Sequence, residues 1–216
     1  MEAAFFAGGI VILLFSVIVH EVMHGVMALK FGDQTAKNAG RLTLNPIPHI
    51  DPLGSIILPM MLILLQSGFI IGWAKPVPVN PMNFSSIRRG ELWVALAGVL
   101  SNLGIAVLAA ILFHLLYPII GLRDVAIDLL RFTVTINLIL AIFNLIPVPP
   151  LDGSKVLMSY LPLKYLREYE KITPYGMMII LMLWIVPIGG VPALTFILGT
   201  TIRLINLILQ VPLKFF

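Results

Sequence analysis

The chain has 216 residues, of which 59% are hydrophobic and only 11% are charged. A water-soluble domain carries about 25% charged residues, so this composition excludes a soluble protein and indicates a chain embedded in a lipid bilayer. The length fits a single domain over residues 1–216. The net charge of +4 is concentrated in a few loops, which indicates a topology signal and not a nucleic-acid site. The absence of cysteine excludes disulfides, thiol nucleophiles and cysteine-ligated metals.

Five apolar stretches are long enough, or nearly long enough, to cross a bilayer as helices. They cover residues 3–29, 91–117, 126–150, 173–189 and 193–212. A sixth stretch, 53–73, is interrupted by glycine, proline and glutamine, which disfavours one continuous helix. Two connecting segments, Gly40–Asn45 and Trp73–Asn80, alternate polar and apolar residues as short strands do. The sequence therefore predicts an all-α polytopic membrane protein with about five transmembrane helices, an interrupted sixth segment and short β-strands.

The first apolar stretch contains an HExxH motif that runs from His20 to His24. Residues four apart lie on one face of a helix, so both imidazoles can bind one zinc ion. Glu21 lies one residue along and can act as a general base toward a water at that ion. The alternative is that the histidines serve only in packing or capping. Three ionisable groups within an apolar helix are costly, however, and indicate a functional site. We therefore predict one Zn2+ per chain.

A catalytic zinc site generally has three protein ligands, and Asp152 is the best candidate for the third. It closes an apolar helix in the segment Asn144–Gly153, which reads NLIPVPPLDG. The prolines end the helix, and Gly153 lets the backbone turn sharply around the carboxylate. Taken alone, Asp152 is more simply an ordinary aspartate at a helix end near the membrane surface. The HExxH motif in the same chain favours the ligand interpretation.

Together these motifs resemble those of the site-2 protease family of intramembrane zinc metalloproteases, and particularly its small prokaryotic branch. The resemblance covers nearly the whole chain. Its anchors are HEVMHG at 20–25, GRLTLNPIPHIDPLG at 40–54, GWAKPVPVNP at 72–81, ALAGVLSN at 95–102 and NLIPVPPLDG at 144–153. The resemblance implies that His20, His24 and Asp152 bind zinc. It also implies that Glu21 is catalytic and that Asn144 helps to hold the substrate or its oxyanion.

Other polar residues have simpler interpretations. His49 is interpreted as a loop histidine, although a role next to the metal ligands stays open. His114 is interpreted as a hydrogen-bonded residue of the interior or the interface, and Asn102 and Asn137 as residues that hydrogen-bond between helices. Val99 stands where the family usually has proline, and this departure leaves the metal ligands untouched.

The path of residues 53–73 follows from the depth that the zinc ligands must share. If this segment crosses the membrane, the helix ends near His24 and Asp152 face opposite sides, and if it enters and returns, they face the same side. A re-entrant path puts ten Lys and Arg residues on the ligand side and two on the other, against seven and five for a full crossing. Positive-inside bias favours the re-entrant path. The sequence therefore predicts an active site toward the cytoplasm of a prokaryotic cell, with the N-terminus outside.

The predicted activity is zinc-dependent hydrolysis of peptide bonds in membrane-spanning protein substrates near the cytoplasmic side. It would serve regulated intramembrane proteolysis or the clearance of membrane peptide remnants. A helix hides its carbonyls, so we expect the substrate to unwind and pair with a strand edge at Gly40–Asn45 or Trp73–Asn80. The candidate edge residues are Trp73, Lys75, Val77 and Val79.

Three rival functions make different demands on the sequence. A transporter would spread its ionisable residues over several helices. An inactive scaffold would lack a metal ligand or Glu21, and a membrane di-iron oxidase would need more than the four histidines present. The identity of the substrate and the oligomeric state stay open.

Overall fold

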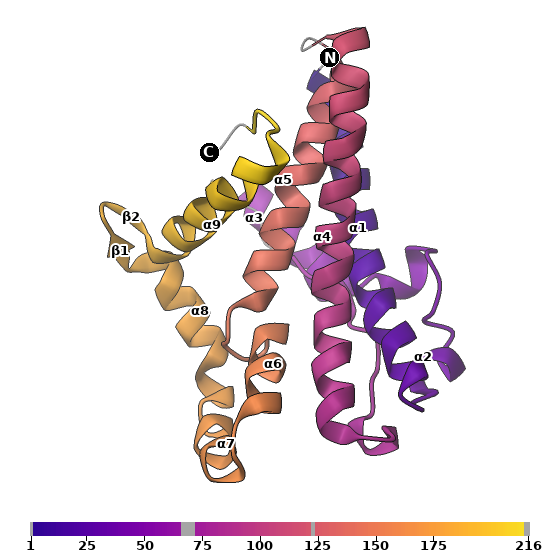
Figure 1. The fold of residues 1–216 in the computed structure, drawn as a ribbon, viewed down its shortest axis with the longest axis vertical. Helices are drawn as coiled ribbons and strands as arrows, with labels where there is room; N and C mark the ends of the chain where they lie inside the picture. Colours follow the sequence, from indigo (N-terminus) through magenta and orange to yellow (C-terminus); the bar gives the residue numbers. More distant parts are fainter. Residues whose placement is uncertain (1, 66–71, 122–123, 214–216) are drawn as a thin grey trace.

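The computed structural model describes residues 2–65, 72–121 and 124–213. Its framework is three long apolar helices, α1 (Glu2–Lys30), α4 (Ile87–Ile120) and α5 (Val125–Leu145). Each is long and apolar enough to cross a membrane, as predicted for three of the five spans. Figure 1 shows that α1 and α5 run in one direction and α4 in the other. The end of α1, the start of α4 and the end of α5 therefore lie at the same end of the bundle.

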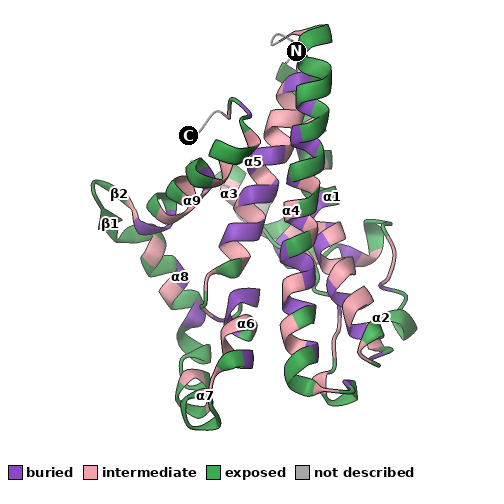
Figure 2. Ribbon diagram, in the orientation of Figure 1, coloured by how far each residue is buried: buried purple, intermediate pink, exposed green. Residues whose placement is uncertain are grey.

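Small side chains line the surface of α4 that packs against α1 and α5. These buried residues are Ala95, Ala97, Gly98, Ala106, Ala109 and Ala110. Within a bilayer there is little hydrophobic force between helices, so close backbone approach at small residues is what holds them together. Buried residues gather where the three helices face one another, whereas the outward faces are exposed (Figure 2). This distribution suits helices whose outer surfaces contact lipid.

The end of α5 positions the helix that follows it, α6 (Asp152–Tyr160). α5 ends at Leu145, earlier than the predicted 150, because a proline follows Ile146 and holds that residue in an extended conformation. Asp152 is the first residue of α6, so it begins a helix and does not close one. The predicted turn at Gly153 is also wrong. Gly153 is helical, and an added Cβ would lie 2.2 Å from the carbonyl oxygen of Leu145.

The C-terminal part contains shorter elements than the sequence predicts. They are α7 (Leu163–Glu170), a 3₁₀ turn at Thr173–Tyr175, α8 (Gly176–Ile185), β1 (Pro187–Ile188), β2 (Val191–Pro192) and α9 (Ala193–Leu209). β1 and β2 form an antiparallel hairpin. At its 10 residues α8 is about 15 Å long, which is about half of a hydrocarbon core. A span count beyond the three long helices stays a prediction.

The connection between α1 and α4 consists of short elements. They are α2 (Thr35–Asn38), a 3₁₀ turn at Ile47–His49, a π-helix at Pro52–Ile57, α3 (Leu58–Leu64) and a 3₁₀ turn at Pro81–Asn83. The strands predicted at Gly40–Asn45 and Trp73–Asn80 are wrong, since both segments are described and form no strand. Pro76 and Pro78 offer no N–H to a ladder, and nearby N–H groups bond elsewhere.

The two ends of the segment 53–73 lie next to each other. The backbone N–H of Trp73 donates to the carbonyl of Gly54 at 3.1 Å, and the Ser55 hydroxyl donates to the carbonyl of Trp73 at 2.8 Å. Residues 66–71 of this segment lie outside the described residues. The chain therefore returns at Trp73 to the place that it left at Gly54.

A buried carboxylate ties the end of α1 to the approach to α4. Asp33 accepts hydrogen bonds at 2.8 Å from the backbone N–H of Asn80 and from the side-chain amide of Asn83. Burial raises the pKa of Asp33, but hydrogen bonds from the Thr35 hydroxyl and from these two residues outweigh burial and hold that pKa below its usual value. The ionised Asp33 carboxylate therefore holds the segment after α1 against the segment before α4.

Candidate metal centre

Three predicted ligand residues from two distant parts of the sequence converge inside the helix bundle. His20 and His24 lie one turn apart on α1, and Asp152 lies at the start of α6. The Nε2 atoms of both histidines lie 3.1 Å from the same oxygen, Oδ2 of Asp152. All three side chains are buried, with residue exposures of 6–8%. Their ligand atoms all lie within 4.8 Å of one another, which is close enough to hold one metal ion.

The histidine rings are turned so that Nε2 is the free ligand atom. Nδ1 of His24 donates to the carbonyl of Val94 at 2.7 Å, and Nδ1 of His20 faces Oδ1 of Asn102 at 2.5 Å. A carbonyl oxygen only accepts, so each Nδ1 carries a proton, and the neutral form of each ring, which is the form that binds a metal, presents its lone pair at Nε2. Two lone pairs and a carboxylate oxygen then face one another, an arrangement that a cation stabilises. Two nitrogens and one oxygen are a common donor set for catalytic zinc.

A chain of side-chain amides fixes the orientation of His20. Asn102 donates to Oδ1 of Asn137 at 2.8 Å, and Asn137 donates to the Ser16 hydroxyl and the Thr133 carbonyl, both at 2.9 Å. The Thr133 carbonyl fixes the orientation of both amides, because it can only accept. The predicted hydrogen bonding between helices is confirmed for Asn102 and Asn137. The sequence did not predict that these hydrogen-bonded amides contact His20. An asparagine in an apolar helix indicates a hydrogen bond but does not indicate its partner.

A glycine on α4 provides the space in which the two rings lie. A Cβ added at Gly98 would lie 2.6 Å from a ring carbon of His24 and 2.7 Å from ring atoms of His20. The neighbouring Val99 is buried, and α4 is continuous through it. Gly98 therefore lets α4 approach the metal-ligand cluster more closely than any other residue would.

The predicted catalytic Glu21 is half-buried and contacts the segment that was predicted to hold substrate. Its Oε2 accepts the backbone N–H of Val77 at 2.8 Å. The N–H groups of Trp73 and Lys75 donate to carbonyls of the preceding loop. Val79 packs against a small apolar cluster around the end of α1. Three of the four N–H groups predicted to be open for pairing with a substrate are therefore used within the protein.

Asn144 lies in the last turn of α5 and is half-buried. Its side-chain amide donates to the carbonyl of Leu140 at 2.9 Å. A primary amide has two N–H donors, so this bond leaves one of them for another acceptor. Its predicted role in holding an oxyanion stays a prediction.

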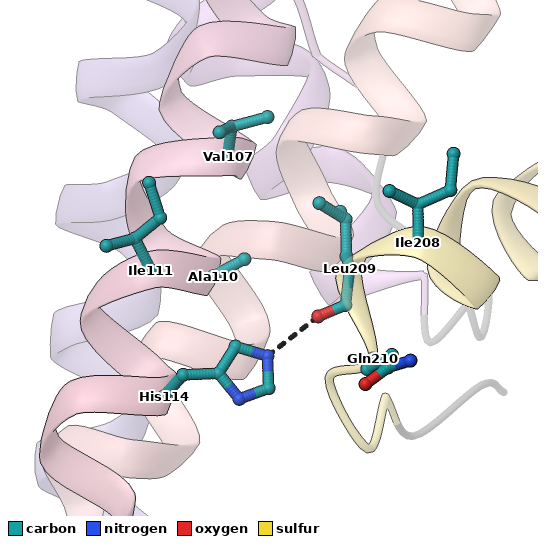
Figure 3. A pocket seen from close by; sticks show the side chains of 7 residues that line it. All are labelled: Val107, Ala110, Ile111, His114, Ile208, Leu209 and Gln210. Carbon is teal, nitrogen blue, oxygen red and sulfur yellow. Dashed lines mark hydrogen bonds between the residues drawn. The ribbon is translucent and has the colours of Figure 1, made fainter.

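A pocket at the other end of α4 does not belong to this site. Figure 3 shows it between α4 and the end of α9. Its lining residues are Val107, Ala110, Ile111, His114, Ile208, Leu209 and Gln210. His114 is exposed and donates from Nε2 to the carbonyl of Leu209 at 2.7 Å, so its predicted hydrogen bond is confirmed but an interior position is not. His114 is twelve residues beyond Asn102, about 18 Å along α4, so the pocket is remote from the metal-ligand cluster.

A buried pair of histidines with one carboxylate ligand and a second carboxylate beside them is the arrangement of a metal-dependent hydrolase. Comparison with known proteins agrees with this class. Residues 121–186, which include Asn144 and Asp152, match the model of peptidase family M50. No solved structure matches the chain significantly.

The relatives come from bacteria. The chain is 36% identical over 186 residues to the “Putative zinc metalloprotease YwhC” of Bacillus subtilis, covering 84% of this chain and 81% of that protein. It is 31% identical over 175 residues to the “Putative zinc metalloprotease Rip2” of Mycolicibacterium smegmatis, covering 81% of this chain and 65% of that protein. The “Putative zinc metalloprotease Rip3” of Mycobacterium tuberculosis is 28% identical over 155 residues, which cover 72% of this chain but only 31% of that protein.

The chain therefore belongs to peptidase family M50, the site-2 protease family of zinc metalloproteases. The resemblance that the motifs indicated is confirmed. Membership also agrees with the apolar helices of a membrane protein.

Proposed function

We propose that this protein is an intramembrane protease that hydrolyses peptide bonds of membrane-spanning proteins near the cytoplasmic side. One Zn2+ per chain would be held by His20, His24 and Asp152. The observation that carries the proposal is the convergence of both Nε2 atoms on one Asp152 oxygen, with Glu21 next to His20 on α1. The names of the bacterial relatives, which describe zinc metalloproteases, support the same activity.

The proton transfers fall to Glu21. When bound, Zn2+ supplies Lewis acidity that polarises the scissile carbonyl and lowers the pKa of an attacking water. Glu21 takes a proton from that water as it attacks, and then returns the proton to the leaving amine. Its Oε2 is held by the Val77 N–H, so the transfer falls to the other carboxylate oxygen.

Asn144 is proposed to stabilise the charge that develops on the substrate carbonyl oxygen. Its amide keeps one N–H on the Leu140 carbonyl, which holds the side chain against α5. The second N–H can donate to the oxyanion, where a donor acts more strongly than on the neutral carbonyl. This division of the two donors would keep the amide oriented without substrate.

A substrate helix must unwind before its carbonyls are accessible. The unwound segment is proposed to lie along Trp73–Val79, because this stretch lies directly beside Glu21. Since Trp73, Lys75 and Val77 use their N–H groups within the protein, the substrate would meet side chains and carbonyl oxygens of this stretch. Regulated proteolysis and clearance of peptide remnants are both compatible with such a site.

Residues 53–73 are proposed to enter the membrane and return to the same side. Two contacts support this path: Trp73 bonds to Gly54 at 3.1 Å, and Asn83 bonds to Asp33 at 2.8 Å. A full crossing of a hydrocarbon core about 30 Å thick would separate each pair by a comparable distance. The distribution of Lys and Arg then favours a cell membrane orientation with the site toward the cytoplasm and the N-terminus outside.

Glu21→Gln tests the protease mechanism directly. The amide oxygen of glutamine can still accept the Val77 N–H, but it cannot carry a proton between water and amine. We expect purified Glu21→Gln to keep its zinc and fold, and to cleave a model transmembrane substrate at least about 100-fold more slowly. Glu168→Gln, which alters an exposed ion pair with Lys171, is the matched control and should cleave normally. Cleavage by Glu21→Gln near the wild-type rate would refute the mechanism.

A further inference from the structure

Two buried residues of the connection between α1 and α4, Arg41 and His49, lie in contact and have no role in the proposed mechanism. Nη2 of Arg41 donates to the carbonyl of Lys75 at 2.7 Å and lies 3.5 Å from Nδ1 of His49. Nε2 of His49 faces the carbonyl of Thr43 at 2.9 Å. Because a carbonyl only accepts, Nε2 of His49 carries a proton and donates to Thr43. Arg41 and His49 are 7% and 2% exposed.

The burial of Arg41 is costly and is not offset by an ion pair. Within the described ranges no carboxylate lies at ion-pair distance from its guanidinium, and its Nε has no hydrogen-bond partner. A buried charge without a counter-ion destabilises a fold, so a purely structural role would be better served by a neutral side chain. The burial of Arg41 therefore indicates that its guanidinium has a function.

Arg41 and His49 together hold one residue by both of its backbone groups. The Lys75 carbonyl accepts from Arg41, and the Lys75 N–H donates to the carbonyl of His49 at 2.8 Å. Pro76 follows, and its ring fixes φ, so the orientation of Lys75 is transmitted to Val77 with little freedom. The Val77 N–H then donates to Oε2 of Glu21 at 2.8 Å. The side chain of Val77 is buried against α1, one turn from Glu21 at Gly25.

We infer that Arg41 and His49 are positioning residues that orient the Glu21 carboxylate through the backbone of Lys75, Pro76 and Val77. A hydrogen bond from a backbone N–H to a carboxylate is short and directional. It fixes which oxygen of Glu21 faces the reacting water, and the contact of Arg41 with Lys75 keeps that N–H in place. The inference rests on the proposed function, since it assumes that Glu21 transfers the proton.

Val77→Pro tests the last step of this path, because it removes the N–H that donates to Glu21. We expect kcat for a model transmembrane substrate to fall by about 10–100-fold, with KM and zinc content unchanged. Val77→Ala is the matched comparison: it keeps the N–H and loses only two methyl groups, so it should lose less kcat than Val77→Pro. Equal losses in both variants, or no loss in Val77→Pro, would overturn the inference.

Arg41→Met tests the first step, and the double variant tests whether both steps belong to one path. Arg41→Met should lower kcat with zinc and thermal stability retained, and Arg41→Lys should restore part of it by donating to the Lys75 carbonyl. Arg41→Met combined with Val77→Pro should be no slower than Val77→Pro alone, because residues that act through one another are not additive. Multiplied losses would show two separate effects and would overturn the path.

Glu21→Gln in the same assay separates this inference from the proposed function. If Glu21→Gln cleaves normally, the proposed function fails and the inference fails with it. If Glu21→Gln is inactive while Val77→Pro and Arg41→Met both cleave normally, only the positioning role is wrong.

Discussion

The two halves of the candidate metal centre are held in place by different kinds of contact. His20, His24 and Asp152 lie on helices and are buried, and their orientation comes from side-chain partners and a helix carbonyl. The half that contacts Glu21 is the segment Trp73–Asn80, which has no regular secondary structure. Backbone groups hold this second half to the loops around it.

This difference implies that metal binding and turnover respond to different substitutions. The helices fix the ligand atoms whether or not the loop segment is in place, so changes near α4 and α6 should alter zinc affinity. The loop segment touches Glu21 and not the ligand atoms, so changes in it should alter the chemical step.

The largest expected effect is an all-or-none difference in chemical labelling, which tests whether both halves approach from one side. The chain lacks cysteine, so single substitutions at the exposed residues Lys37 and Arg89 report on the two ends of the connection. We expect both cysteines to react with an impermeant thiol reagent only from the cytoplasmic side. A cysteine at Asp124, in the connection between α4 and α5, should react only from outside. Opposite labelling of Lys37→Cys and Arg89→Cys would contradict a re-entrant 53–73.

A smaller effect is expected from Asn144 in the last turn of α5, which should change turnover without changing zinc binding. Asn144→Ala removes the proposed oxyanion donor and should lower kcat by about 10–1000-fold, with zinc content unchanged. Asn206→Ala is a control on α9, where the amide bonds to the Val211 carbonyl far along the chain from the ligands. An Asn144→Ala enzyme with the kcat of the wild type would remove this residue from the mechanism.

A smaller effect is expected from the amide chain behind His20. Asn102→Leu leaves Nδ1 of His20 without its acceptor and should weaken zinc binding by about 10–100-fold. At saturating zinc, kcat should recover, because Glu21 and its loop contact are untouched. Competition with a chelator measures the affinity. Unchanged affinity in Asn102→Leu would mean that packing alone orients the ring.

Much of the side-chain half could be predicted from the sequence, because zinc chemistry demands particular residue types. HExxH on one helix face leaves few other interpretations, and Asp152 was the best remaining acid for a third ligand. The three long helices follow from apolar runs of sufficient length. The hydrogen bonds that link Asn137 to Asn102 and Asn102 to His20 could not be predicted, because the sequence identifies an asparagine but not its hydrogen-bond partner.

The backbone half could not be predicted, because every residue except proline offers the same N–H. The contact of Val77 with Glu21 leaves no signal in the sequence, and the alternation of polar and apolar residues in Trp73–Asn80 predicts a strand that does not form. Tertiary contacts decided otherwise: Arg41 and Glu21 bond to groups that a strand would have paired. α8 is shorter than the predicted span 173–189 because proline and glycine residues follow Ile185 and end the helix. Hydropathy alone does not detect such helix ends.

The most direct test of the central claim is the zinc content of purified Asp152→Ala beside the wild type. Wild-type protein should contain one zinc per chain, and Asp152→Ala should lose most of it, because two imidazoles alone bind zinc weakly. Asp128→Ala, which removes the half-buried partner of Arg131 on the first turn of α5, should keep its zinc. Undiminished zinc in Asp152→Ala would contradict the assignment of His20, His24 and Asp152 as one metal site.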